Sequence, residues 1–150
     1  MKKVTSLLLC VFLLAMLLPV DRVLAESNEG VICFDDGSYL TIILEVSRTR
    51  ELGSTSGTKY YSYYNSEGAL EWQAALYGRF TYTGNGCACT EANCNVTIYN
   101  TAWYVVSKTA SRSGNSAIGE LTMGRKWLGI TVDQVPVSLL LSCDVNGNLS

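Results

Sequence analysis

The chain has 150 residues, 48% of them hydrophobic, with 11 basic and 13 acidic side chains and a formal net charge of −2. It contains no histidine, which excludes Ser-His-Asp and Cys-His nucleophilic mechanisms because both use an imidazole as the base. Its few Lys and Arg residues are not clustered, so nothing indicates binding to the phosphate backbone of a nucleic acid.

The N-terminal segment has the three parts of a cleavable secretory signal peptide. Residues 1–3 carry positive charge, residues 7–20 form an apolar run, and Ala25 ends a stretch of small or modest residues. We therefore expect cleavage between Ala25 and Glu26, removal of residues 1–25, and secretion of the mature chain into the extracellular space.

Two other interpretations of this segment fit its residues less well. A spanning helix needs ~20 apolar residues, and here Asp21 and Arg22 follow the shorter run at once. A lipoprotein signal needs a small residue before its cysteine, but Leu9 precedes Cys10 and much of the apolar run is still to come. No other hydrophobic span follows, so we expect no membrane association after processing.

The expected mature chain, residues 26–150, has the length of a single domain. Eight basic and twelve acidic residues remain in it, giving a net charge of about −4, which favours solubility and indicates little else. Its first part, residues 26–37, resembles a flexible N-terminal segment. Residues 38–150 are expected to form a single β-rich extracellular domain.

Short runs rich in Val, Ile, Thr, Tyr and Trp, which are the residue types that favour strands, make up this domain. In chain order, strands are predicted at 39–46, 58–64, 70–76, 79–83, 95–99, 103–108, 116–123, 128–132 and 135–143. Turn residues separate the runs, as in Ser113-Gly114-Asn115, with a regular spacing typical of an all-β fold. We predict a small antiparallel β-sandwich, with a barrel as the alternative.

The secondary structure of two stretches does not follow from strand-favouring residues. Residues 69–76 contain helix-favouring Ala, Leu, Glu and Gln, but the stretch is short and lies between Gly68 and Gly78, so we favour a strand. Residues 53–57 are rich in Gly and Ser and are expected to form a flexible loop.

Five cysteines remain after cleavage: Cys33, Cys87, Cys89, Cys94 and Cys143. Exported proteins meet oxidising conditions, so we expect one or two disulfides, and the odd number leaves one thiol unpaired. Cys89–Cys94 or Cys87–Cys94 would close a short loop. Cys33–Cys143 would join the terminal strands and, because it closes a much longer loop, would stabilise the fold more.

No metal, cofactor or catalytic residue is predicted. The C-x-C and C-x4-C spacings do not match a zinc site, and no histidine is available to complete one. Asp35 and Asp36 would point to opposite faces of a strand and fit a turn better than a catalytic pair. The Asp144–Asn148 stretch has calcium-loop spacing only in its first half, so we expect a polar turn there.

The aromatic residues offer the best candidate binding surface. Tyr60, Tyr61, Tyr63 and Tyr64 would place tyrosines on both faces of one strand, with Trp103 as a further candidate. Exposed Tyr and Trp are efficient contact residues. The alternative is that one face of each strand packs in the core, which still leaves at least one tyrosine exposed.

Four segments carry a resemblance to known proteins: Tyr-Ser-Tyr-Tyr-Asn-Ser-Glu-Gly-Ala-Leu (61–70), Thr-Ile-Tyr-Asn-Thr-Ala-Trp-Tyr-Val-Val-Ser-Lys (97–108), Met-Gly-Arg-Lys-Trp-Leu-Gly (123–129) and Leu-Ser-Cys-Asp-Val-Asn-Gly-Asn-Leu-Ser (141–150). With them the chain resembles small secreted proteins of unknown function from Gram-positive, Clostridia-type bacteria. The resemblance implies export and a β-rich domain, and it brings no activity or site residues. Cys87 is an addition to the pattern, which makes it the candidate for the unpaired thiol.

These observations favour a secreted, non-enzymatic binding domain that contacts a carbohydrate, such as a cell-wall or surface glycan, through exposed tyrosines. A secreted bacteriocin or toxin-like effector is the alternative. An enzyme of another type would require a polar cleft that contains carboxylates with perturbed pKa values.

Overall fold

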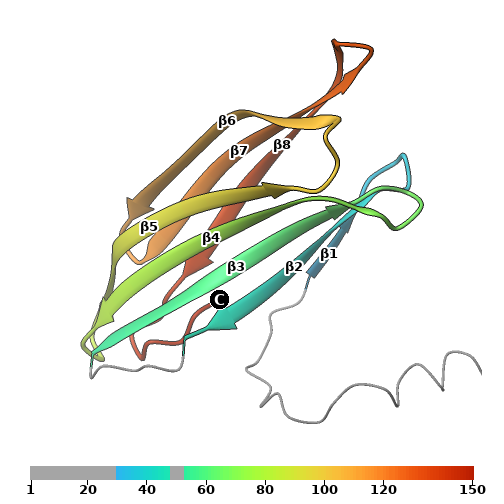
Figure 1. The fold of residues 1–150 in the computed structure, drawn as a ribbon. Coiled ribbons are helices and arrows are strands. Elements are labelled where there is room, and N and C mark those ends of the chain that lie inside the picture. Colours follow the sequence, from blue (N-terminus) through green and yellow to red (C-terminus); the bar gives the residue numbers. More distant parts are fainter. Residues whose placement is uncertain (1–29, 48–52) are drawn as a thin grey trace, which may run out of the picture.

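The computed structural model describes residues 30–47 and 53–150, which fold into two antiparallel sheets (Figure 1). The strands are β1 (Gly30–Cys33), β2 (Tyr39–Val46), β3 (Ser54–Tyr64), β4 (Leu70–Tyr82), β5 (Cys87–Ile98), β6 (Trp103–Ser113), β7 (Ser116–Trp127) and β8 (Ile130–Ser142). One sheet has the order β1-β2-β3-β4-β5 and the other β6-β7-β8. Each strand therefore pairs with its neighbour in the sequence, except where the chain passes from β5 to β6.

The predicted all-β class is confirmed, and the fold is sandwich-like. Within the described residues the strands remain in two separate sheets, so the barrel alternative is not realised. These residues form no helix, and hence none that would be long and apolar enough to span a bilayer. The strand predicted for the 69–76 stretch is confirmed, since residues 70–76 belong to β4, which begins at Leu70.

Several strands are longer than predicted, because single residues that resemble breaks do not interrupt the pairing. The runs at 70–76 and 79–83 are one strand, β4, in which Gly78 lies on the inner face against the Phe80 ring. The runs at 128–132 and 135–143 also belong together in β8, which contains Pro136. β8 is at the edge of its sheet, a position that tolerates a proline lacking a backbone donor.

Two segments expected to be flexible contain strands instead. Gly30–Cys33, in the stretch 26–37, forms β1 and pairs with residues 39–42 of β2. Ser54–Gly57, in the stretch 53–57, begins β3 and pairs with residues 78–81 of β4. Ladder hydrogen bonds to the neighbouring strands order both segments, and Val31, Ile32 and Thr55 are residue types that favour strands.

The core lies between the two sheets and is built from the inward side of each strand's alternation. Trp72, Ala74, Leu76 and Phe80 of β4 are completely buried. The three-stranded sheet supplies the opposite wall with Ala117, Leu121, Met123, Leu139 and Leu141. Its strand β6, in contrast, is almost entirely exposed after Trp103.

Loops gather at the two ends of the sandwich. The β1–β2, β3–β4 and β5–β6 connections and the β7–β8 hairpin lie at one end, which we call the pocket end (Figure 1). The β4–β5 and β6–β7 connections and the C-terminal residues lie at the other.

Candidate functional site

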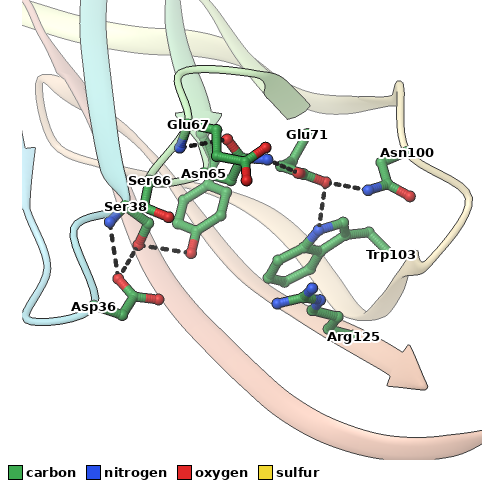
Figure 2. Close-up of a pocket in the computed structure, with 10 residues that line it drawn as sticks. Asp36, Ser38, Asn65, Ser66, Glu67, Glu71, Asn100, Trp103 and Arg125 are labelled. Atoms are coloured by element: carbon green, nitrogen blue, oxygen red, sulfur yellow. Dashed lines mark hydrogen bonds between the residues drawn. The ribbon is translucent and has the colours of Figure 1, made fainter.

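A polar pocket of about 300 Å³ opens at the pocket end (Figure 2). Its lining comes from three connections and from the adjoining ends of β3, β4, β6 and β7: Asp36, Ser38, Tyr63, Asn65, Ser66, Glu67, Glu71, Asn100, Trp103 and Arg125. This volume lies at the lower limit for small-molecule sites, which are usually mainly apolar.

Glu71, at the start of β4, organises the wall of this pocket. Its buried carboxylate accepts hydrogen bonds from Asn65 Nδ2 (2.7 Å), Asn100 Nδ2 (2.6 Å) and Trp103 Nε1 (3.0 Å) (Figure 2). A buried carboxylate is tolerated only when such donors replace its lost hydration. Glu71 therefore cross-links the β3–β4 turn to the β5–β6 connection.

The two asparagines are engaged in their own turns as well. Asn65 Oδ1 accepts the backbone N–H groups of Glu67 and Ala69, at 3.0 and 2.9 Å. Asn100 Oδ1 accepts the Ala102 N–H at 3.0 Å. These side chains close tight turns in the manner typical of asparagine. The polar groups of both asparagines are therefore already used in hydrogen bonds that stabilise the fold.

Asp36, on one side of the pocket, does not have the electrostatics of a general acid. The Ser38 hydroxyl and N–H both donate to Asp36 and lower the pKa of its carboxyl, with a smaller effect of the Arg125 charge. A general acid at neutral pH needs the opposite shift. The Asp35-Asp36-Gly37 stretch is the predicted turn. The pocket also has the exposed guanidinium of Arg125 and the exposed side chain of Glu67 in its lining.

Three of the five aromatic residues predicted as a binding surface lie in the core instead. Tyr61, Tyr63 and Trp103 are all buried. Tyr63 stacks on Trp72 with ring centroids 5.1 Å apart and meets the Trp103 ring edge-on at 5.3 Å. Tyr61 reaches across to the other sheet, where its hydroxyl bonds the Leu140 backbone N–H at 3.0 Å.

The other two, Tyr60 and Tyr64, are half-buried on the outer face of the five-stranded sheet. The register adds two tyrosines that the sequence did not single out for this role. Tyr39 lies opposite Tyr64, and their rings stack at 4.9 Å with an interplanar angle of 8°. Tyr77 lies opposite Thr58 on the same face. We call the surface formed by Tyr39, Tyr60, Tyr64 and Tyr77 the tyrosine face.

Polar side chains fill the space between these rings. Thr41, Ser62, Gln73 and Thr97 lie side by side on successive strands of the register. Gln73 Nε2 donates to Ser62 Oγ at 2.8 Å. In the next row Ala75 pairs with exposed Asn95. No described element packs over this face (Figure 1).

The structure leaves all five cysteines as free thiols and does not bring the predicted pairs together. Cys89 and Cys94 lie in one strand opposite Phe80 and Leu76, roughly 13 Å or more apart at the usual rise per residue. A disulfide needs Cα atoms within about 7 Å. Cys87–Cys94 is excluded for the same reason, because Cys87 lies still farther along β5.

Cys33 and Cys143 lie at opposite ends of the sandwich. Cys33 pairs with Tyr39, which pairs with Tyr64, which in turn pairs with Leu70. Cys33 therefore lies at the same end of the sheet as the start of β4. Cys143 instead approaches Cys87 to 2.8 Å, and Cys87 pairs with Tyr82 at the end of β4. Cys87, the candidate for the unpaired thiol, is a free thiol in the structure and the neighbour of Cys143.

The thiols differ in environment. Cys33 is exposed, whereas Cys89, Cys94 and Cys143 are buried. Burial raises the pKa of Cys143 to about 12, and its hydrogen bond with Cys87 adds to the shift. Burial also raises the pKa values of Cys89 and Cys94.

Two further predictions concern the C-terminal turn and the signal peptide. Asp144 Oδ1 accepts the backbone N–H groups of Asn146 and Asn148, both at 2.8 Å, which confirms the polar turn.

Within residues 30–47 and 53–150, no group of three or more His, Cys, Asp or Glu side chains is arranged to hold a metal. The expected cleavage site at Ala25 and Glu26 lies outside the described residues.

Comparison with family models, curated proteins and solved structures finds no match to this chain. The resemblance to Gram-positive secreted proteins therefore stays a prediction.

Proposed function

We propose that the chain is a secreted, non-enzymatic binding domain whose tyrosine face contacts a carbohydrate, such as a cell-wall or surface glycan. The observation that supports this most is the combination of four tyrosines with hydroxyl and amide side chains on one uncovered sheet face.

The aromatic rings suit the apolar side of a sugar ring. Tyrosine combines a large apolar surface with a polar hydroxyl, so it makes efficient contacts on surfaces that are wet in the free state. The stacked pair Tyr39–Tyr64 holds two rings in place before any ligand arrives. Such preorganisation reduces the side-chain entropy lost on binding.

The polar row supplies the complementary chemistry. The Gln73 amide and the Thr41 and Thr97 hydroxyls both donate and accept hydrogen bonds, as the hydroxyl groups of a glycan require. An open sheet face suits an extended polymer that crosses several strands. The pocket suits this role less, because the amides of Asn65 and Asn100 are already bonded to Glu71.

The test is sedimentation of the purified protein with insoluble peptidoglycan and a panel of polysaccharides. We expect Tyr60→Ala, and separately Tyr39→Ala combined with Tyr64→Ala, to weaken binding about tenfold or more, the scale of losing an aromatic contact at an interface. Circular dichroism and thermal unfolding would establish that the variants fold.

Tyr104→Ala is the matched control, because Tyr104 is a half-buried tyrosine on β6 of the three-stranded sheet and does not belong to the tyrosine face. It should bind like the wild type. Equal binding by the folded tyrosine-face variants, or no binding of the wild type to any glycan, would refute the proposal.

A further inference from the structure

The β7–β8 hairpin ends in a group of exposed apolar side chains. Trp127, Leu128, Ile130 and Val132 are 68%, 81%, 70% and 53% exposed. We call these four residues the hairpin tip. Leu128, Ile130 and Trp127 are the three most exposed large apolar side chains among the described residues, and their clustering on one turn marks a candidate interaction site.

The tip extends beyond the neighbouring strand. β6 begins at Trp103, which pairs with Arg125, and the last backbone bond from the β5–β6 connection runs from Lys126 N–H to the Ala102 carbonyl. Beyond that point Trp127 pairs only with Ile130 across the turn. In Figure 1 the hairpin projects past the rest of the molecule at the top of the view, and no described element covers it.

The turn holds Leu128 in an unfavourable backbone conformation and exposes its apolar side chain to water. Leu128 and Gly129 have φ values of 50° and 80°, the backbone of a two-residue turn that favours Asn-Gly. Leucine rarely adopts this left-handed conformation. Leu128 thus combines a disfavoured backbone with an exposed apolar side chain, and such outliers cluster at functional surfaces.

The residues at the base of the tip are basic. Arg125 and Lys126 are exposed, and the Lys126 ammonium lies 4.6 Å from the centre of the Tyr104 ring. The Tyr104 hydroxyl in turn lies 2.7 Å from Thr131 Oγ1 on β8. Asp133 is the one acidic residue on this part of the hairpin and pairs with Arg125, which leaves one net positive charge.

The size and shape of the tip favour a membrane over a folded partner. A stable protein interface takes about 800 Å² from each side and needs a complementary surface. Four side chains on one narrow turn supply only part of that area, whereas a bilayer needs no complementary shape. Tryptophan prefers the membrane–water boundary, and basic residues next to an apolar group add attraction to anionic lipids.

We propose that the hairpin tip inserts into the boundary between headgroups and acyl chains of a membrane that contains anionic lipid, with Arg125 and Lys126 at headgroup level. The expectation of no membrane association rested on the lack of a spanning segment, and it does not bear on a tip of four side chains. The tip is separate from the tyrosine face, so glycan binding without lipid and lipid binding without glycan are independent measurements.

The test measures binding of the exported protein to vesicles of phosphatidylcholine, alone or with phosphatidylglycerol. Trp72 and Trp103 are 0% and 4% exposed, so aqueous acrylamide quenches mainly Trp127. We expect anionic vesicles to shift Trp127 emission to shorter wavelength and to protect it from acrylamide. Leu128→Asn suits the turn better and should lower vesicle affinity about tenfold or more, because it removes the leucine that becomes buried when the tip enters the membrane.

Leu140→Thr is the matched control, since Leu140 is 50% exposed on β8 away from the tip, and it should bind vesicles like the wild type. Arg125→Gln combined with Lys126→Gln should weaken binding to anionic vesicles only. Failure of the wild type to bind, a Trp127 that stays open to acrylamide, or full binding by Leu128→Asn would overturn the proposal. The first two results would leave a protein as the partner of the tip.

Discussion

Glu71 illustrates how one residue joins parts of the chain that are distant in sequence. Its carboxylate collects donors from three positions spread over 39 residues, Asn65, Asn100 and Trp103. Two of these donors also close turns of their own. The geometry of the pocket end therefore depends on a single buried charge.

We predict that Glu71→Ala lowers the free energy of unfolding by about 2–3 kcal/mol. The substitution removes charge-assisted hydrogen bonds and leaves the buried Trp103 N–H without a partner. Glu67→Ala, in the adjoining β3–β4 turn and exposed, is the control and should change stability by less than about 0.5 kcal/mol. Urea titrations would measure both, and similar values for the two variants would contradict the structural role of Glu71.

At the scale of elements, strand pairing decides which side chains meet. β5 keeps Cys89 and Cys94 apart because both lie along one extended strand. Cys143 directly follows the last residue of β8. The course of β8 places it beside Cys87, at the start of β5. The sheets are thereby placed so that a disulfide would connect them at the end opposite the pocket.

We predict that mild oxidation joins Cys87 to Cys143. The bond would close a loop that in the chain-entropy model contributes about 4 kcal/mol. Peptide mapping after blocking the remaining thiols identifies the pair, and thermal unfolding with and without reductant measures its effect.

Cys33→Ser serves as the control for this experiment. Cys33 is exposed on β1 and distant from the pair, so its replacement should leave the bond and its stabilisation unchanged, while Cys87→Ser abolishes both. A bond from Cys143 to any other cysteine would contradict the prediction.

At the scale of the whole molecule, the two sheets stack because small residues allow their close approach. A Cβ atom built on Gly119 of β7 would lie 3.0 Å from Leu139 Cδ1 and 3.3 Å from Leu76 Cδ1, which belongs to the other sheet. Leu76 and Leu139 are both completely buried. The spacing between the sheets at this point therefore depends on the absence of a side chain.

We predict that Gly119→Ala destabilises the fold by about 1–3 kcal/mol, the usual cost of overpacking a filled core. Gly86→Ala is the control, because nothing lies within 4 Å of a Cβ at that position and its φ is not positive. Differential scanning calorimetry of the two variants tests this. A Tm for Gly119→Ala that matches the Gly86→Ala value would argue against close packing at this point.

Local sequence was sufficient to predict the all-β class, most of the strands, and the turns at Asp35–Gly37 and Asp144–Asn148. Alternation of β-branched and aromatic residues reflects a physical constraint within each strand, namely that successive side chains point to opposite faces. The same alternation requires tyrosines on both faces of β3, with Tyr61 and Tyr63 on one and Tyr60 and Tyr64 on the other. It does not say which face is covered.

Only the tertiary structure decided that question, because it depends on where the second sheet packs. The packing buries Tyr61, Tyr63 and Trp103 and leaves the opposite face open, where the register adds Tyr39 and Tyr77. The packing also brings Cys143 close to Cys87, and it leaves the hairpin tip uncovered. Pairing and stacking act between residues distant in the sequence, so no local pattern contains them.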